Sequence, residues 1–328
     1  MRRRSALIAV PALMLSAAGC GSSKTATPSS ASPTTPSASA PPVKIVAGPV
    51  PPVTAGTAFG QKPTVAKGTG TPSPDLAVET AIQGSGPVIA KGDYLQANYL
   101  GQIWDTGKVF DNSYDRGTPL LVQIGTGQVI PGWDAGLIGK NGGSRVEMAV
   151  PPAQGYGPSG NPQAGITGTD TLVFVIDVID VFGPTSSAHG TEVPQTDVSL
   201  PKVGVNTDGK AAAITVPKVK PPTDLVSRYI IEGSGPVVKS SGTLLLQYEG
   251  VLWDSGKEFD SSYQHSQLAL FPLARLIKGW QEGLVGKKVG SRVLLVVPPS
   301  LGYGAQGQPP TIPGDATLVF ALDIIATS

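Results

Sequence analysis

Two twelve-residue stretches of the sequence each place a tryptophan between glycines, just after an apolar pair. Residues 129–140 read VIPGWDAGLIGK and residues 276–287 read LIKGWQEGLVGK, with seven of the twelve positions identical. The chain has four tryptophans, so this motif uses half of them. Such an indole either fills the core of a duplicated fold or forms the floor of an apolar pocket that the protein uses twice.

The titratable residue types limit the chemistry that the chain can perform. It has one cysteine, Cys20, and two histidines, His189 and His265. This composition argues against disulfides, metal sites and Ser-His-Asp catalysis, and we predict neither a metal nor a cofactor. With 14% charged residues and a net charge of +1, the sequence also offers no clustered basic excess for nucleic acid.

The N-terminus has the order of a bacterial export signal. Three arginines at positions 2–4 precede an apolar stretch over residues 6–18, which is too short to span a bilayer as a helix. The ending SAAGC resembles a lipoprotein processing site, so we predict a signal peptide at 1–19 and lipidation of Cys20. The alternative is an ordinary signal with a coincidental cysteine. We expect an extracytoplasmic protein, anchored by lipid to the cell membrane.

A long internal repeat defines the domain organisation. DLAVETAIQGSGP from Asp75 returns as DLVSRYIIEGSGP from Asp224, at an offset of 149 residues. The Pro-, Ser- and Thr-containing segments 20–74 and 184–223 are predicted to be a tether and a linker. The predicted domains are therefore 75–183 and 224–328. GQKPTV at 60–65 aligns with GKAAAI at 209–214, which leaves open a short arm for each repeat.

Within a repeat, the apolar residues follow mainly the period of a strand. Alternate residues from Leu95 to Ile103 share one face, and those from Leu244 to Leu252 do the same in the second copy. One helix is predicted after Ile130, where Trp133 and Leu137 lie at positions i and i+4, and it is short because glycines crowd its end. The pattern indicates a duplicated α+β domain.

Five motifs that recur in order in both repeats resemble the FKBP-type peptidyl-prolyl cis-trans isomerases. They are Tyr-x-Gly, Gly-Lys-x-Phe-Asp-x-Ser, Val-Ile-x-Gly-Trp (Leu-Ile in the second copy), Tyr-Gly and Thr-Leu-Val-Phe. The resemblance implies two tandem FKBP-like domains, each a twisted antiparallel half-barrel sheet wrapped on one short helix. The active pocket would lie between sheet and helix.

The resemblance also assigns roles in the first repeat. Trp133 would form the pocket floor, Ile130 would offer its backbone N–H to the substrate, and Tyr156 would donate from the rim. The implied catalytic residues are Tyr99, Phe110, Asp111 and Tyr156; the implied substrate-binding residues are Arg116, Val129, Ile130, Trp133, Ile166 and Phe174. Leu120 stands where an aromatic wall residue is common in the family.

The second repeat departs further from the family pattern. Its implied catalytic residues are Tyr248, Phe259, Asp260 and Tyr303, and its implied substrate-binding residues are Leu276, Ile277, Trp280, Ile312 and Phe320. His265 replaces the arginine that partners the acidic residue, and the segment from Phe259 to Trp280 is two residues shorter. We expect weaker or altered activity there.

An apolar aromatic pocket suits the isomerisation of an X-Pro bond. The planar amide separates more charge than the twisted one, so poor hydration favours the transition state, and no histidine is needed. The predicted partners are proline-containing segments of exported proteins and the membrane through Cys20; the sequence leaves open whether macrolide inhibitors bind. Two alternatives remain: a non-enzymatic proline-binding chaperone that uses the same pockets, and a scaffold in which one repeat keeps a pocket.

Overall fold

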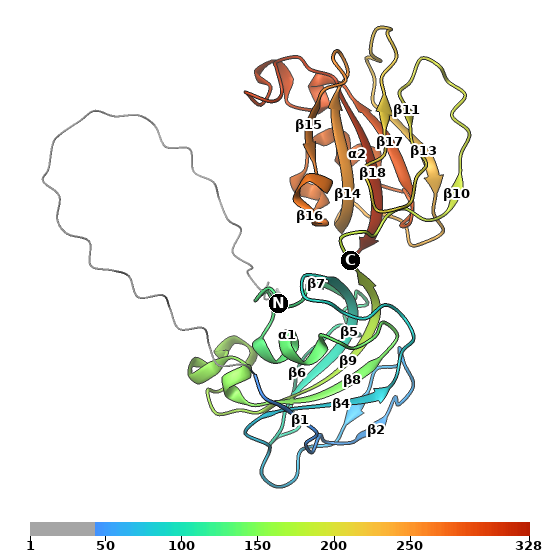
Figure 1. Ribbon diagram of the computed structural model, residues 1–328. Coiled ribbons are helices and arrows are strands. Elements are labelled where there is room, and N and C mark those ends of the chain that lie inside the picture. Colours follow the sequence, from blue (N-terminus) through green and yellow to red (C-terminus); the bar gives the residue numbers. More distant parts are fainter. Residues whose placement is uncertain (1–42) are drawn as a thin grey trace, which may run out of the picture.

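The computed structural model describes residues 43–328, which form two similar units joined by a short connection (Figure 1). The predicted signal peptide 1–19, Cys20 and the start of the predicted tether lie outside the described residues. Each unit contains a seven-stranded sheet and one α-helix. No helix in the described part of the chain is long and apolar enough to cross a membrane.

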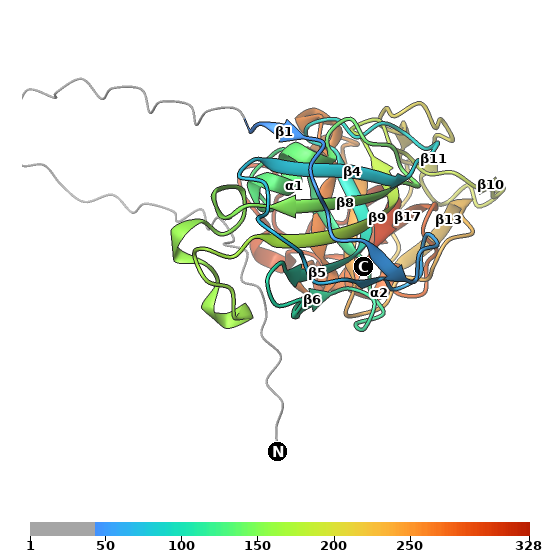
Figure 2. The same ribbon diagram turned by 90° about the horizontal axis from the view of Figure 1, so that it is seen from below.

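The first sheet has the order β1-β4-β8-β9-β5-β6, and β7 also pairs with β5. Neighbouring strands are antiparallel except β1 and β4, which run parallel. Figure 2 shows β1, β4, β8 and β9 side by side. The elements of this unit are β1 Ile45–Val46, β2 Val53–Ala55, β3 Thr64–Val65, β4 Leu76–Ile82, β5 Tyr94–Ile103, β6 Val109–Asn112, β7 Leu120–Gln123, α1 Pro131–Leu137, β8 Arg145–Val150 and β9 Leu172–Phe182.

The second sheet repeats this path as β10-β13-β17-β18-β14-β15, and β16 also pairs with β14. Here the edge strand β10 is antiparallel to β13. The elements are β10 Thr191–Glu192, β11 Lys202–Val203, β12 Ile214–Thr215, β13 Val226–Glu232, β14 Thr243–Leu252, β15 Glu258–Ser261, β16 Ala269–Pro272, α2 Lys278–Leu284, β17 Arg292–Val297 and β18 Leu318–Thr327. The two units confirm the predicted duplication of an α+β domain.

Both faces of each sheet are buried, which explains why β9 reads almost continuously apolar as LVFVIDVIDVF. Phe174 and Ile176 join the core beneath α1, together with Trp133 and Leu137 of that helix. Val175, on the other side of β9, belongs to a second core on the opposite face. The helix spans seven residues and ends before Gly139, whose φ of +83° favours glycine.

The second core is built by the segment before β4, which corrects the predicted tether. Val46, Val50 and Val53 pack against a cluster that contains Val65 and the fully buried Trp104. Residues 43–74 therefore form an arm that covers the sheet. The segment packs on the sheet although its valines are few and isolated, because a large indole at the end of β5 supplies the remaining contact area.

The predicted linker 184–223 likewise forms an arm on the second unit. Ala188, Val203 and Ala212 are buried in a cluster with Trp253, whose indole N–H donates to the carbonyl of Val219 at 3.0 Å. The other two tryptophans of the chain thus hold the arms.

A buried ion pair fastens each arm to its sheet. The side chains of Arg145 and Asp177 are 1% and 0% exposed, and they form a bidentate ion pair with N···O distances of 2.6 and 2.7 Å. The same guanidinium donates to the backbone carbonyls of Gly56 and Gln61 in the arm. Arg292 and Asp323 repeat this pair in the second unit, where Arg292 donates to two arm carbonyls at 2.8 Å.

The two units contact each other through apolar side chains at the C-terminal end of β18. Tyr94 and Leu121 of the first unit form one buried cluster with Leu245, Leu268 and Ile325 of the second. The C-terminus accordingly lies between the units in Figure 1. This contact involves neither of the tryptophans of α1 and α2.

Candidate active site

Four aromatic rings form an edge-to-face chain between α1 and the first sheet. The ring centroid of Trp133 lies 5.3 Å from those of Tyr99 and Phe174, and Phe174 lies 5.7 Å from Phe110. Trp133, Tyr99 and Phe174 are buried, whereas Phe110 is half-buried. The indole N–H of Trp133 has no hydrogen-bond partner among the described residues. The cluster supplies an apolar floor with one partly open wall.

Gly101 makes room for this wall. A Cβ atom at this position would lie 2.6 Å from the Phe110 ring and 2.8 Å from the Phe174 ring. Gly250 has the same relation to Phe259 and Phe320 in the second unit. The glycine of the Tyr-x-Gly motif is therefore required by the close approach of two rings.

A polar network closes one side of the aromatic cluster. The Tyr99 hydroxyl donates to Asp111, Arg116 forms an ion pair with the other carboxylate oxygen of Asp111, and Arg116 also donates to the Tyr99 hydroxyl at 2.8 Å. Burial, and next the hydrogen bond to Asp111, raises the pKa of Tyr99, so this tyrosine stays protonated at neutral pH. The network fixes the carboxylate beside the aromatic cluster.

The loop before α1 presents an unused backbone donor. The amide N–H of Ile130 has no acceptor among the described residues, although Ile130 is only half-exposed. Val129, also half-buried, packs with Ile130 against the main core. Asp134 of α1 holds the loop by accepting the amides of Gly125 and Gly127 at 2.7 and 2.8 Å. The free amide is thus positioned to donate to a carbonyl oxygen.

Tyr156 and Ile166 come from the long loop between β8 and β9. Tyr156 is 38% exposed, and burial of the rest of its ring raises the pKa of its hydroxyl, with a smaller contribution from the charge of Asp111. Its hydroxyl is therefore a donor at neutral pH. Ile166 is 2% exposed and belongs to the core cluster that contains Trp133. The structure brings every site residue predicted for the first repeat to one region.

The second unit keeps the aromatic cluster. Trp280 lies 5.5 Å from Tyr248 and 5.1 Å from Phe320, and Phe320 lies 5.4 Å from Phe259. Ile312 is buried in the same core, which Leu276 and Ile277 pack against, and Tyr303 is 38% exposed like its counterpart.

The polar side of the second cluster is incomplete. The Tyr248 hydroxyl donates to Asp260 at 2.8 Å. His265 is exposed, and within residues 43–328 no cationic group forms an ion pair with Asp260. The carboxylate therefore has one fixed hydrogen bond where the first unit has a closed three-residue network.

Two further differences escaped the sequence analysis. Leu120 pairs with Ala97 in the first sheet, and the matching pair in the second sheet is Leu246 with Ala269, so one wall residue shrinks from leucine to alanine. Gln281 replaces Asp134 and bonds the Leu276 carbonyl at 2.6 Å, after a short 3₁₀ helix that the first unit lacks. The Asp-to-Gln change within the repeated motif could have indicated that the loop before the helix differs between the two units.

The buried carboxylate of Glu249 makes the stability of the second unit depend on pH. Burial, and next a hydrogen bond to Glu258, raises the pKa of Glu249 to about 7 from the ordinary 4.5. Because the folded pKa is the higher one, the stabilisation is complete below about pH 4.5 and is lost as the pH rises through about 7.

We therefore expect the free energy of unfolding of the second unit to fall by about 2 kcal/mol from pH 5 to pH 8, since each pKa unit corresponds to about 1.4 kcal/mol and the proton is shared with Glu258. Denaturant titrations of the wild type and Glu249→Gln measure this. The variant should flatten the pH dependence, whereas the exposed control Glu192→Gln should not. A wild-type stability that rises over this range contradicts the assignment.

Among the described residues, no group of three or more His, Cys, Asp or Glu side chains is placed to hold a metal ion. The groups gathered around Trp133 offer apolar contact, a free amide and tyrosine hydroxyl donors.

Comparisons with known proteins agree with this geometry. Residues 86–179 and 235–325 match the family model of the FKBP-type peptidyl-prolyl cis-trans isomerases. An FK506-binding protein of Streptomyces anulatus is 41% identical over 121 residues, which are 37% of this chain and 98% of that protein. The peptidyl-prolyl cis-trans isomerase FKBP9 of Rattus norvegicus is 32% identical over 234 residues, which are 71% of this chain and 35% of that protein. The crystal structure of FkpA from Escherichia coli is 41% identical over 33% of this chain and 51% of that one, with a TM-score of 0.31.

The chain therefore belongs to the FKBP-type peptidyl-prolyl cis-trans isomerase family and carries two copies of the family domain. This confirms the resemblance on which the sequence analysis relied. The chain spans nearly all of the Streptomyces protein but about a third of the length of FKBP9.

Proposed function

We propose that the first unit is the main isomerase of the chain and acts on X-Pro bonds of exported, partly folded proteins at the outer face of the cell membrane. The observation that carries the proposal is the closed network of Tyr99, Asp111 and Arg116 beside the Trp133 floor. In the second unit, the same floor lacks the cation.

The proposed mechanism uses binding and desolvation. The prolyl ring rests on Trp133, where water is excluded and the planar, charge-separated amide loses hydration. The Ile130 N–H and the Tyr156 hydroxyl donate to carbonyl oxygens of the substrate and hold the chain on either side of the twisting bond. Lowering the ~18–20 kcal/mol barrier by about 4 kcal/mol gives about 1000-fold acceleration. Desolvation with one or two such hydrogen bonds is of this magnitude.

Refolding of a protein with a proline-limited slow phase separates the proposal from its main alternative. An isomerase accelerates the slow phase when present at a small fraction of the substrate concentration. A proline-binding chaperone instead raises the yield only near equimolar amounts and leaves the rate unchanged. We also expect an FK506-type macrolide to inhibit the acceleration by occupying the first pocket, as the name of the Streptomyces relative suggests.

The membrane location rests on Cys20 and is tested separately. In a bacterial host, the wild-type chain should incorporate labelled fatty acid and sediment with membranes, because the acyl chains of a lipoprotein together bind the bilayer firmly. Cys20→Ser should lose the label and appear in the soluble extracytoplasmic fraction. Wild-type protein without label excludes the lipid anchor, and label retained in the variant excludes Cys20 as its site.

A further inference from the structure

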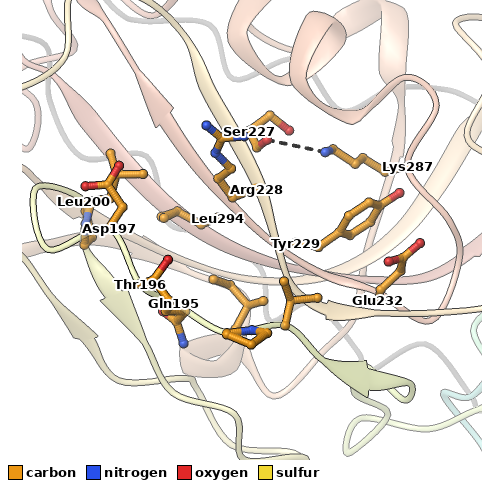
Figure 3. A pocket seen from close by; sticks show the side chains of 14 residues that line it. Gln195, Thr196, Asp197, Leu200, Ser227, Arg228, Tyr229, Glu232, Lys287 and Leu294 are labelled. Atoms are coloured by element: carbon orange, nitrogen blue, oxygen red, sulfur yellow. Dashed lines mark hydrogen bonds between the residues drawn. The ribbon is translucent and has the colours of Figure 1, made fainter.

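A cavity of about 430 Å³ lies in the second unit between β13 and the arm segment 193–201, and Figure 3 shows the side chains around it. Four consecutive β13 residues, 227–230, line this cavity. Successive side chains of a strand point to opposite faces of the sheet. A cavity that contacts both sets must lie along the edge of the strand, beside its backbone.

The edge of β13 is open because β10 pairs only with the C-terminal end of that strand. The pairs Thr191–Glu232 and Glu192–Ile231 are followed by one more bond, from the Val193 amide to the Ile230 carbonyl at 2.9 Å. The arm then turns away, and the Gln195 side chain is fixed by two hydrogen bonds to the backbone of Val203, at 2.7 and 2.8 Å. These hydrogen bonds hold the arm away from β13, so the cavity between them stays open.

The corresponding edge of the first unit is filled by a strand of the chain itself. β1 lies parallel to β4, with Ile45 opposite Leu76 and Val46 opposite Ala77. The Leu76 amide donates to the Lys44 carbonyl at 3.2 Å. Leu76 and Ala77 are both 0% exposed as a result.

Without such a strand, the second unit leaves the equivalent positions uncovered. Leu225 and Val226, which correspond to Leu76 and Ala77 at the repeat offset of 149, are half-buried. The Leu225 amide has no hydrogen-bond acceptor among the described residues. Each of the two side chains packs at the margin of a different core, so an added strand would bury apolar surface on both faces.

The charge at one end of the open edge indicates which segment fits. In the first unit, the Nζ of Lys44, the residue before β1, lies 2.6 Å from a carboxylate oxygen of Asp75, and Asp224 is the counterpart of Asp75. At the other end, the cavity lining carries both signs of charge, with Arg228 and Lys287 beside Asp197 and Glu232. A parallel strand therefore matches this edge when it begins with a basic residue and continues with β-branched residues.

We infer that the β13 edge, from Asp224 to Tyr229, binds an extended segment of a partner polypeptide by strand addition, in the register that β1 adopts on β4. This site is separate from the aromatic pocket of the same unit and works whether or not that pocket isomerises prolines. Backbone hydrogen bonds provide the affinity, and the carboxylate of Asp224 provides the selectivity for a basic residue.

The probe is a capped peptide with the sequence of residues 43–50, VKIVAGPV, added to the ¹⁵N-labelled chain. We expect amide shifts to concentrate at residues 224–229. In a strand, the N–H and C=O of one residue point to the same side, and the Lys44 carbonyl faces β4. N-methylation at the peptide's Val46 removes one hydrogen bond to β13 and should therefore reduce binding about tenfold or more. N-methylation at its Ile45 removes none and should change binding less than about threefold.

A charge reversal tests the register without disturbing the backbone. Asp224→Lys should weaken the peptide about threefold or more, and a peptide with glutamate in place of its lysine should recover the loss. The matched control Asp254→Lys, at an exposed residue in a turn, should leave both peptides unchanged.

Three outcomes overturn the inference. The first is equal binding of the two N-methylated peptides. The second is a set of amide shifts confined to residues 75–78, which would mean that the peptide displaces β1. The third is absence of peptide binding together with dimerisation of the chain by exchange of residues 43–50.

Discussion

Replacing Arg145 by methionine should destabilise the first unit by about 3–5 kcal/mol, the cost of leaving a buried carboxylate without its cation. Asp177 is 0% exposed, and Arg145 also donates to Gly56 and Gln61 of the arm. The arm should then detach, and hydrogen exchange of residues 43–70 should accelerate more than that of α1. Denaturant unfolding together with exchange mass spectrometry measures both effects.

Arg116→Met is the matched control for this prediction. Arg116 pairs with Asp111, but the two side chains are 48% and 28% exposed, so its loss should cost less than about 1 kcal/mol. The double variant Arg145→Met/Asp177→Leu should recover part of the stability lost in Arg145→Met, because it removes the unpaired charge. Equal, small losses in both single variants contradict the view that the buried pair fastens the arm.

Replacing Trp133 by leucine should lower kcat/KM of the whole chain on a short X-Pro peptide about tenfold to a hundredfold. This range corresponds to about 1.4–2.7 kcal/mol of transition-state stabilisation. The leucine keeps an apolar floor but gives up the contacts of the indole with Tyr99 and Phe174. A protease-coupled isomerisation assay measures the change, and circular dichroism verifies that the variant is folded.

Trp280→Leu makes the same change in the second unit. It should remove only that unit's share and lower the total rate less than about twofold, because Asp260 lacks the cation that Asp111 has. A larger loss from Trp280→Leu than from Trp133→Leu reverses the assignment of the main isomerase.

The elements around the pocket could be predicted because their signals are local. The helix at 131–137 follows from one apolar spacing ended by glycines, and the strands follow from a period of two that occurs twice at one offset. The resemblance of the repeated motifs to the FKBP family then implied which aromatic residues surround the tryptophan. Each of these patterns is contained within a dozen residues.

The arms could not be predicted from composition because their burial depends on distant partners. Val46, Val50 and Val53 are isolated among prolines and glycines, and they become core residues only against Trp104, about fifty residues further along the chain. The available signal was a charge inside each of two apolar strands, Arg145 in SRVEMAV and Asp177 in TLVFVIDVI. Both charges recur in the second repeat, which is expected of an ion pair that the fold requires.

The pocket margin was predicted in part. The repeat showed that His265 stands in place of Arg116, and the open side of Asp260 is the structural counterpart of that change. The role of Asp134 in holding the loop before α1 was not visible, because it depends on a turn that brings Gly125 and Gly127 back to the helix. Loop geometry of this kind is set by tertiary contacts.

The most direct test of the central claim is the isomerisation rate of an X-Pro peptide with two matched double variants of the whole chain. Asp111→Val/Tyr156→Phe removes the network carboxylate and the rim donor from the first unit, and Asp260→Val/Tyr303→Phe does the same in the second. We predict that the first pair removes most of the turnover and the second leaves most of it. Undiminished turnover in the first variant, or no turnover by the wild type, contradicts the account.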